Sequence, residues 1–125
     1  MKNSRMKFKI DSAYLCVKNM DRAVKFYESL FLRKCLKKDE IYSVMKFGDF
    51  RIGLFANNRV KESVKYGDNC LLSIKVDSIK EFLNHLNKLK VKLVYPLTKI
   101  GRNWVIEFRD SEGNDLEAYS NKFIN

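Results

Sequence analysis

The segment WVIEFRDSEGNDLEAY, residues 104–119, lies near the C-terminus and determines how the rest of the chain is interpreted. An aromatic and β-branched run enters a segment of turn-forming residues, and a second alternating run leaves it, which predicts a β-hairpin. Gly113 and Asn114 are expected to take the positive-φ positions of the turn. The outgoing strand would place Glu117 on one face and Leu116 and Ala118 on the other. A single acid on a strand does not define a site, so its meaning depends on the rest of the chain.

The chain consists of two halves with the same order of predicted elements. The first half has an amphipathic helix capped by Asn19 and strand patterns at 8–17, 32–36, 41–47 and 50–56. The second half has a helix capped by Ser78 and strand patterns at 70–76, 91–95, 103–109 and 115–120. Apolar positions of the two halves match at a constant spacing of 59 residues: Val17, Met20, Ala23, Val24, Tyr27 and Leu30 correspond to Val76, Ile79, Phe82, Leu83, Leu86 and Leu89. This agreement indicates an internal duplication of a β-α-β-β-β module.

We therefore predict a single α+β domain over residues 1–125. Module one covers about 8–57, a linker about 58–69, and module two about 70–120. Each module would bury one sheet face under its helix, and the two curved mixed sheets would leave their other faces around a cleft. A chain of 125 residues can bury a core of its own, so disulfides and structural metals are optional.

Composition restricts the environment and the partners. Three widely spaced cysteines without a C-x-x-C motif predict reduced thiols, not a disulfide framework or a zinc site. No apolar run can span a membrane and the basic N-terminus lacks a signal-peptide core, so we expect a cytoplasmic protein without a membrane partner. The net charge of +10 is spread over the whole chain instead of gathering in one block. Nucleic-acid binding through a basic surface is therefore only a remote alternative.

Two stretches resemble a known family. VKNMDRAVKFY, residues 17–27, is similar to the first strand-to-helix segment of the glyoxalase, bleomycin-resistance and extradiol-dioxygenase superfamily, also called the vicinal oxygen chelate fold. DSEGNDLE, residues 110–117, is similar to its D-P-x-G-N-x-x-E signature, with Ser111 in place of the proline. The resemblance extends from about Lys9 to Tyr119 and implies the fold of two tandem β-α-β-β-β modules around a cleft.

Catalytic members of that family bind a divalent metal through four positions, and the resemblance implies where these fall. They correspond to Ser12, Gly53, Leu71 and Glu117, with Ile52 replacing Gly53 if the count is shifted by one. Only Glu117 is a metal-ligand residue type, whereas such sites take three or four protein ligands. The one histidine, His85, is expected on the surface of the second helix. We therefore predict no metal, no other cofactor and no catalytic residue.

Strand alternation selects the residues that would face a ligand. These cleft candidates are Tyr14, Cys16, Arg51, Ser73, Lys75, Trp104, Glu117 and Tyr119. Trp104 could stack on a planar ligand or, alternatively, fill the core or a dimer contact. A carboxylate in a partly dry cleft needs a cation, so Lys75 or Arg51 is predicted to pair with Glu117; the alternative is an acid exposed to solvent.

The preferred functional interpretation is a metal-free protein resembling the bleomycin-resistance proteins. It would form a homodimer and sequester a small planar molecule in a cleft. The positive net charge predicts a neutral or anionic ligand. The alternative is a metal-dependent lyase, isomerase or dioxygenase whose ligands lie at other positions, so the question of enzymatic activity stays open.

Overall fold

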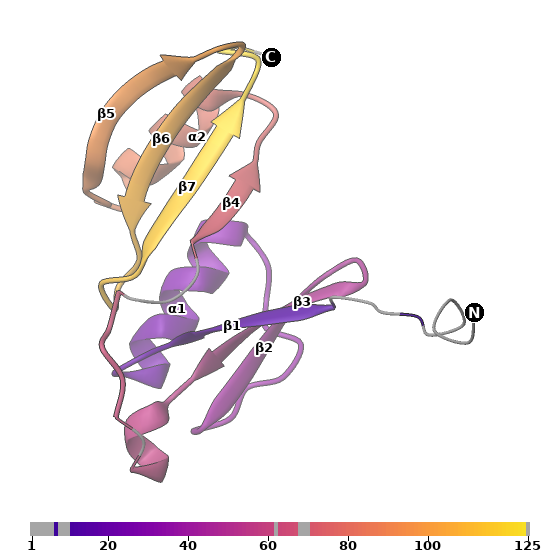
Figure 1. Cartoon of the computed structure of the whole chain (residues 1–125), viewed down its shortest axis with the longest axis vertical. Coiled ribbons are helices and arrows are strands. Elements are labelled where there is room, and N and C mark those ends of the chain that lie inside the picture. The colour runs from indigo at the N-terminus through magenta and orange to yellow at the C-terminus, as the bar shows by residue number, and fades with distance from the viewer. Residues whose placement is uncertain (1–6, 8–10, 62, 68–70, 125) are drawn as a thin grey trace.

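The structure is a computed structural model that describes residues 7, 11–61, 63–67 and 71–124. Its elements follow the predicted duplication apart from one strand (Figure 1). In chain order they are β1 (Ser12–Cys16), α1 (Met20–Phe31), β2 (Tyr42–Phe47), β3 (Phe50–Phe55), η2 (Asn57–Val60), β4 (Leu72–Lys75), α2 (Ile79–Lys88), β5 (Leu93–Ile100), β6 (Asn103–Arg109) and β7 (Asp115–Ser120). The starts of two predicted strands, 8–10 and 70, and linker residues 62, 68 and 69 lie outside the described residues.

Both sheets are mixed, and they share one topology apart from the extra edge strand β5 of the second, which confirms the α+β class. The first sheet has the order β1-β3-β2 and the second has the order β4-β7-β6-β5. The first strand of each module runs parallel to the last one, β1 to β3 and β4 to β7, and the other strand pairs are antiparallel. Figure 1 shows α2 behind the β4–β7 sheet and α1 near the junction of the modules. The two sheets remain separate and do not close into a barrel.

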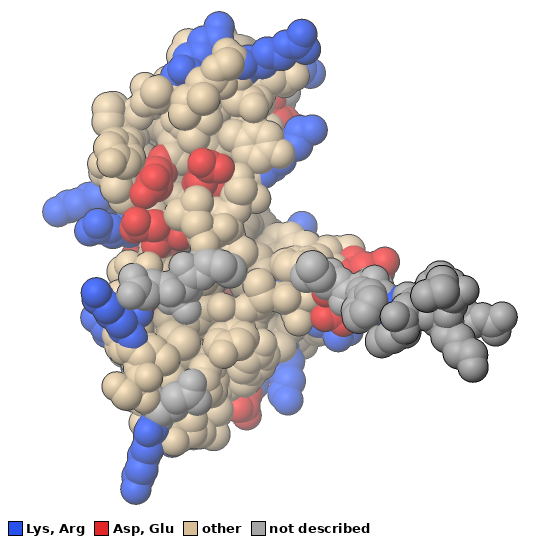
Figure 2. Space-filling model, in the orientation of Figure 1, with Lys and Arg blue, Asp and Glu red and all other residues tan. Residues whose placement is uncertain are grey.

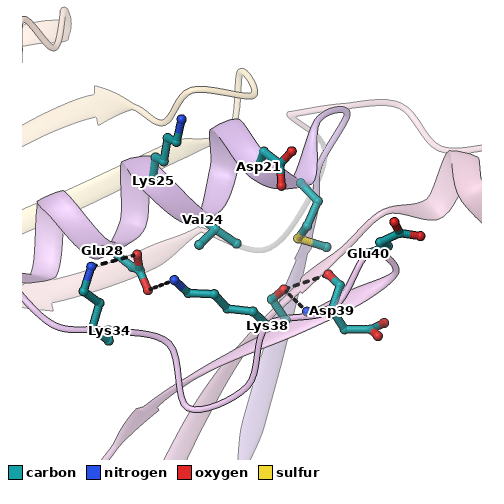
Figure 3. Close-up of a pocket in the computed structure, with 10 residues that line it drawn as sticks. Asp21, Val24, Lys25, Glu28, Lys34, Lys38, Asp39 and Glu40 are labelled. Atoms are coloured by element: carbon teal, nitrogen blue, oxygen red, sulfur yellow. Dashed lines mark hydrogen bonds and ion pairs between the residues drawn. The ribbon is translucent and has the colours of Figure 1, made fainter.

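The strand predicted at 32–36 does not form, so that part of the prediction is wrong. Leu32 ends α1 in the left-handed conformation, with φ of 55°. The Glu28 carboxylate then accepts the Cys35 N–H at 2.8 Å and pairs with Lys38 at 3.2 Å, which holds the following loop against the helix (Figure 3). The loop contacts β2 at Val44, whose carbonyl accepts the Leu36 N–H at 2.8 Å, and Lys37 forms an isolated bridge to the same residue. The displaced loop leaves a cavity of about 640 Å³ beside α1.

One hydrophobic core connects the two modules. Tyr27 and Leu30 of α1 lie in the same buried cluster as Leu86 of α2 and Phe108 of β6. On β7, Leu116 and Ala118 face this core, as the hairpin alternation predicted. Burial of this continuous apolar surface is the main stabilising contribution to the fold. None of the helices in the described ranges has the length and apolar character needed to cross a membrane.

Candidate functional site

Asp110, Glu112 and Asn114 in the turn between β6 and β7 are buried, and their side chains connect the two modules. The Asp110 carboxylate accepts the Tyr27 hydroxyl at 2.5 Å, the Glu112 N–H at 2.8 Å and the Asn114 N–H at 2.8 Å. Gly113 has a φ of 91°, but Asn114 does not have a positive φ, so that part of the turn prediction is wrong. Its side-chain amide instead donates to the Cys16 carbonyl at 3.1 Å, across the module boundary.

Glu112 lies at the centre of a second connection, which the sequence interpretation missed. Its fully buried carboxylate accepts the N–H groups of Lys18 and Asn19 at 2.8 and 2.9 Å. Arg22 donates through Nε at 2.7 Å and Nη2 at 3.0 Å, and the Ser111 hydroxyl donates at 2.8 Å. Burial opposes ionisation of the Glu112 carboxyl, but these donors outweigh it and hold its pKa below the ordinary range.

These contacts join the two stretches that carry the family resemblance. The signal was present in the sequence, because an acid in the 110–117 segment and an arginine in the 17–27 segment form a complementary pair. Arg22, Asp110 and Glu112 therefore have structural roles at the module junction. They position the hairpin whose outgoing strand carries Glu117.

The four positions of the family's metal site do not fit a metal. Gly53 lies under the Tyr42 ring, so closely that a Cβ added at Gly53 would overlap the Tyr42 hydroxyl. Ser12 pairs with Arg51 on the adjacent strand, and Leu71 is an exposed apolar residue just before β4. Within the described ranges, no group of three or more His, Cys, Asp or Glu residues is placed to hold a metal.

His85 is less peripheral than expected. Its Nε2 lies 3.0 Å from the Ser29 carbonyl oxygen and 2.9 Å from that of Leu30, at the end of α1. An Nε2–H proton can donate to both carbonyls. His85 is half-buried on the second helix, away from the sheet faces as expected, but its links to α1 were not predicted.

The face of the first sheet that points away from the helices carries an aromatic group. Tyr14, Tyr42 and Phe55 lie together, with ring centroids 5.6 Å apart for Tyr14 and Phe55 and 6.3 Å apart for the two tyrosines. Tyr14 is half exposed, so its ring offers apolar surface and a hydroxyl to a ligand. Burial, and to a smaller extent Tyr14, raises the pKa of Tyr42.

The corresponding face of the second sheet carries carboxylates, and Figure 2 shows acidic side chains gathered there. Glu107 lies directly opposite Glu117 in the β6–β7 pair. Glu117 accepts the Ser73 hydroxyl at 2.6 Å, and Asp115 accepts Arg109 Nε at 3.0 Å. Burial, followed by the charges of Asp115 and Glu117, raises the pKa of Glu107. The ionised form of Glu107 is therefore less favourable than that of an ordinary glutamate, and an added cation would stabilise it.

The cation predicted to accompany Glu117 is not found among the described residues. Lys75 lies opposite Tyr119, two pairs further along the parallel strands, and exposed Arg51 lies on the other sheet. No lysine or arginine of the described ranges forms a salt bridge with Glu117. The ion-pair prediction is therefore wrong, because the Ser73 hydroxyl hydrogen-bonds to the carboxylate.

Register divides the cleft candidates between the two sheet faces. Tyr14, Cys16 and Arg51 share the aromatic face, although Cys16 is buried. The carboxylate face holds four more: Ser73, Lys75, Glu117 and Tyr119. Trp104 alternates with Glu107 and lies on the opposite, helix side, where its ring contacts Phe123 at 5.3 Å and Lys99 Nζ at 5.3 Å.

Comparison with known proteins identifies the family. The model of the Glyoxalase/Bleomycin resistance protein/Dioxygenase superfamily matches residues 9–118. A lactoylglutathione lyase structure from Agrobacterium tumefaciens is 20% identical with a TM-score of 0.72, covering 91% of this chain and 94% of that one. A glyoxalase-related enzyme from Fulvimarina pelagi is 12% identical with a TM-score of 0.75, covering 90% and 87%. These structures establish a common fold, and no curated protein matches the chain.

Proposed function

The chain belongs to the glyoxalase, bleomycin-resistance and dioxygenase superfamily, and from this premise we propose that it binds and sequesters a small planar molecule without using a metal. The observation that carries the proposal is the Tyr42 ring over Gly53, at one of the family's metal-ligand positions. An aromatic side chain there supplies a stacking surface where a catalytic member would supply a ligand atom. Glu117 likewise serves as a hydrogen-bond acceptor on the second face.

The open sheets support a homodimer as the binding form. Tyr14 is 50% exposed on the first sheet and Tyr95 is 62% exposed on the second. Aromatic residues are enriched at protein interfaces and in the walls of ligand sites. We propose that a second copy covers these faces, so that a planar ligand is enclosed between them.

The ligand charge follows from the local carboxylates. The net charge of +10 predicts a neutral or anionic ligand, but charges beyond about 8 Å are largely screened at physiological ionic strength. Glu107, Asp115 and Glu117 would contact the ligand directly. We therefore propose a planar ligand with a cationic or strongly hydrogen-bond-donating group over β6 and β7.

Equilibrium dialysis with three planar aromatic probes tests the proposal: proflavine as the cation, naphthalenemethanol as the neutral compound and naphthoate as the anion. Proflavine is expected to bind most tightly, and Glu117→Gln is expected to weaken it about five-fold, since a charged hydrogen bond contributes about 1 kcal/mol at a part-exposed site. Glu40→Gln, an exposed acid outside this face, is the control. Binding of none of the three probes would contradict the proposal, and stoichiometric metal in protein purified without chelators would support the enzyme alternative.

Proton linkage gives a second readout of the same site. Because the Glu107 pKa is raised in the unliganded protein, a bound cation would favour its ionised form and release a proton. Proflavine affinity is therefore expected to rise with pH through the raised Glu107 pKa, as followed by titrations from pH 4 to 7. Glu107→Gln should flatten this dependence, whereas an equally steep profile in that variant would contradict the assignment.

A further inference from the structure

A second cavity lies beside Phe26 of α1, and Arg109, which pairs with Asp115 on the carboxylate face, lines one part of it. It has a volume of about 560 Å³ and lies between α1, the segment after α2 and the β6–β7 turn. Both modules contribute to it, since Phe26 comes from the first and the 89–94 segment from the second. Its size and its place between two structural units are typical of small-molecule sites.

The floor of this groove is apolar. Phe26 supplies an aromatic ring, which packs edge-on against buried Tyr27 at 5.2 Å. Leu89, Val91 and Val94 supply aliphatic surface, and all three are only partly buried. A hydrocarbon chain placed here would bury its own apolar surface together with theirs.

The rim of the groove is cationic. Lys90, Lys92 and Arg109 line it and are exposed. Asp110 is the acid that borders it, and its carboxylate accepts hydrogen bonds from Tyr27, Glu112 and Asn114 inside the protein. Arg109 already pairs with Asp115, so the two lysines are the cations most available to a ligand. Their charge complements an anionic head group beside an apolar tail.

Lys90 stands at a position whose backbone favours glycine. Its φ is 59°, and the N–H groups of Lys90 and Val91 bond to the carbonyls of Asn87 and Leu86, which forms a Schellman motif after α2. Glycine adopts this left-handed conformation at lower cost than lysine. The effect of this side chain on binding can therefore be separated from its effect on folding.

We propose that this groove binds an anionic amphiphile, a carboxylate with an aliphatic tail of medium length. The tail would lie over Phe26 and Val91, and the carboxylate would contact Lys90 and Lys92. This site is distinct from the planar-ligand site on the sheets, because Phe26, Lys90 and Lys92 lie outside both ligand-facing sheet faces, although Arg109 borders both sites. Loss of one binding activity therefore does not predict loss of the other.

Nuclear magnetic resonance titration of the whole chain tests the proposal with three probes below their micelle concentrations: octanoate, octylammonium and acetate. Octanoate is expected to shift the amide signals of residues 90–94 and Ser111, and octylammonium, with the same tail, to bind at least about five-fold more weakly. Acetate should cause no saturable shift because it lacks the tail. Equal affinity for the two octyl compounds, or octanoate shifts confined to β6 and β7, would overturn the proposal.

Two variants test the assigned lysines. Lys92→Glu is expected to weaken octanoate binding about five-fold, whereas Lys80→Glu, an exposed charge reversal on α2 outside the groove, should leave it unchanged. Lys90→Gly is expected to weaken octanoate binding about three-fold while raising the thermal midpoint, because glycine relieves the backbone cost. Unchanged octanoate affinity in both Lys90→Gly and Lys92→Glu would refute the proposed carboxylate contacts.

Discussion

Replacing Glu112 with alanine tests whether the signature turn holds the two modules together. The change removes a fully buried carboxylate that accepts hydrogen bonds from Lys18, Asn19, Arg22 and Ser111. Two of these donors are backbone N–H groups just before α1, and each loses its side-chain acceptor. The substitution therefore affects the entry of the first helix as well as the turn itself.

The expected loss follows from the exposure of each donor. The N–H groups of Lys18 and Asn19 are only part-buried, so loss of their acceptor costs about 1 kcal/mol each, and with a small cavity at Glu112 the total is about 3 kcal/mol. Arg22 adds little to this sum, because its side chain is 52% exposed and its guanidinium can turn to water. Arg22→Ala alone should cost about 1 kcal/mol, since Glu112 keeps its other donors.

Urea unfolding at neutral pH, followed by far-ultraviolet circular dichroism, measures both changes. Glu40→Ala provides a matched control, because that acid is 81% exposed and pairs with exposed Arg59, and it should cost less than about 0.5 kcal/mol. The Glu112→Ala and Arg22→Ala double variant should cost less than the sum of the single changes. A larger loss for Arg22→Ala than for Glu112→Ala would refute the view that the backbone donors dominate.

Three further measurements test other parts of the structure. Tyr27→Phe removes the hydroxyl that donates to Asp110 and should lower the free energy of unfolding by about 1–2 kcal/mol, while ordinary stability in urea would contradict the buried contact. Gly53→Ala should cost about 1–3 kcal/mol by displacing the Tyr42 ring, and Tyr42→Ala in the same chain should recover part of it. The folded-state pKa of Glu112 is lowered, so its ionised carboxylate contributes fully to stability above the unfolded-state pKa. That contribution is lost as pH falls through the folded-state pKa. Below about pH 4, the free energy of unfolding should therefore depend less on pH in Glu112→Gln than in the unchanged protein.

Local patterns were sufficient to predict most of the fold. The alternation around Glu117 placed Leu116 and Ala118 in the core, and the two capped helices begin where the cap residues predicted. The prediction of a strand at 32–36 failed, although its residues have the composition of a strand, because a tertiary contact determines their conformation. Glu28 binds the Cys35 N–H, and this pairing is visible only once the helix and loop are in place.

The candidate site was less predictable because a face is defined by neighbouring strands. The alternation of side chains along each strand correctly assigned Ser73 and Glu117 to the same sheet face, and the structure pairs these two residues directly. Alternation along a single strand could not predict that Glu107 lies opposite Glu117, because this pairing depends on the register of the β6–β7 hairpin. It also could not reveal that Tyr42 covers Gly53, because a side chain of another strand fills the missing volume.

The signature segment combines two roles that the structure separates. Asp110 and Glu112 are buried and accept hydrogen bonds from α1 or the segment before it, so the fold depends on them. Glu117 is only partly buried on the outer face of the sheet, and its hydrogen-bond partner is the Ser73 hydroxyl. The turn residues can therefore maintain the module junction whether or not the strand residue binds a metal. For this reason the signature identifies the fold, whereas the chemistry depends on what lies beside Glu117.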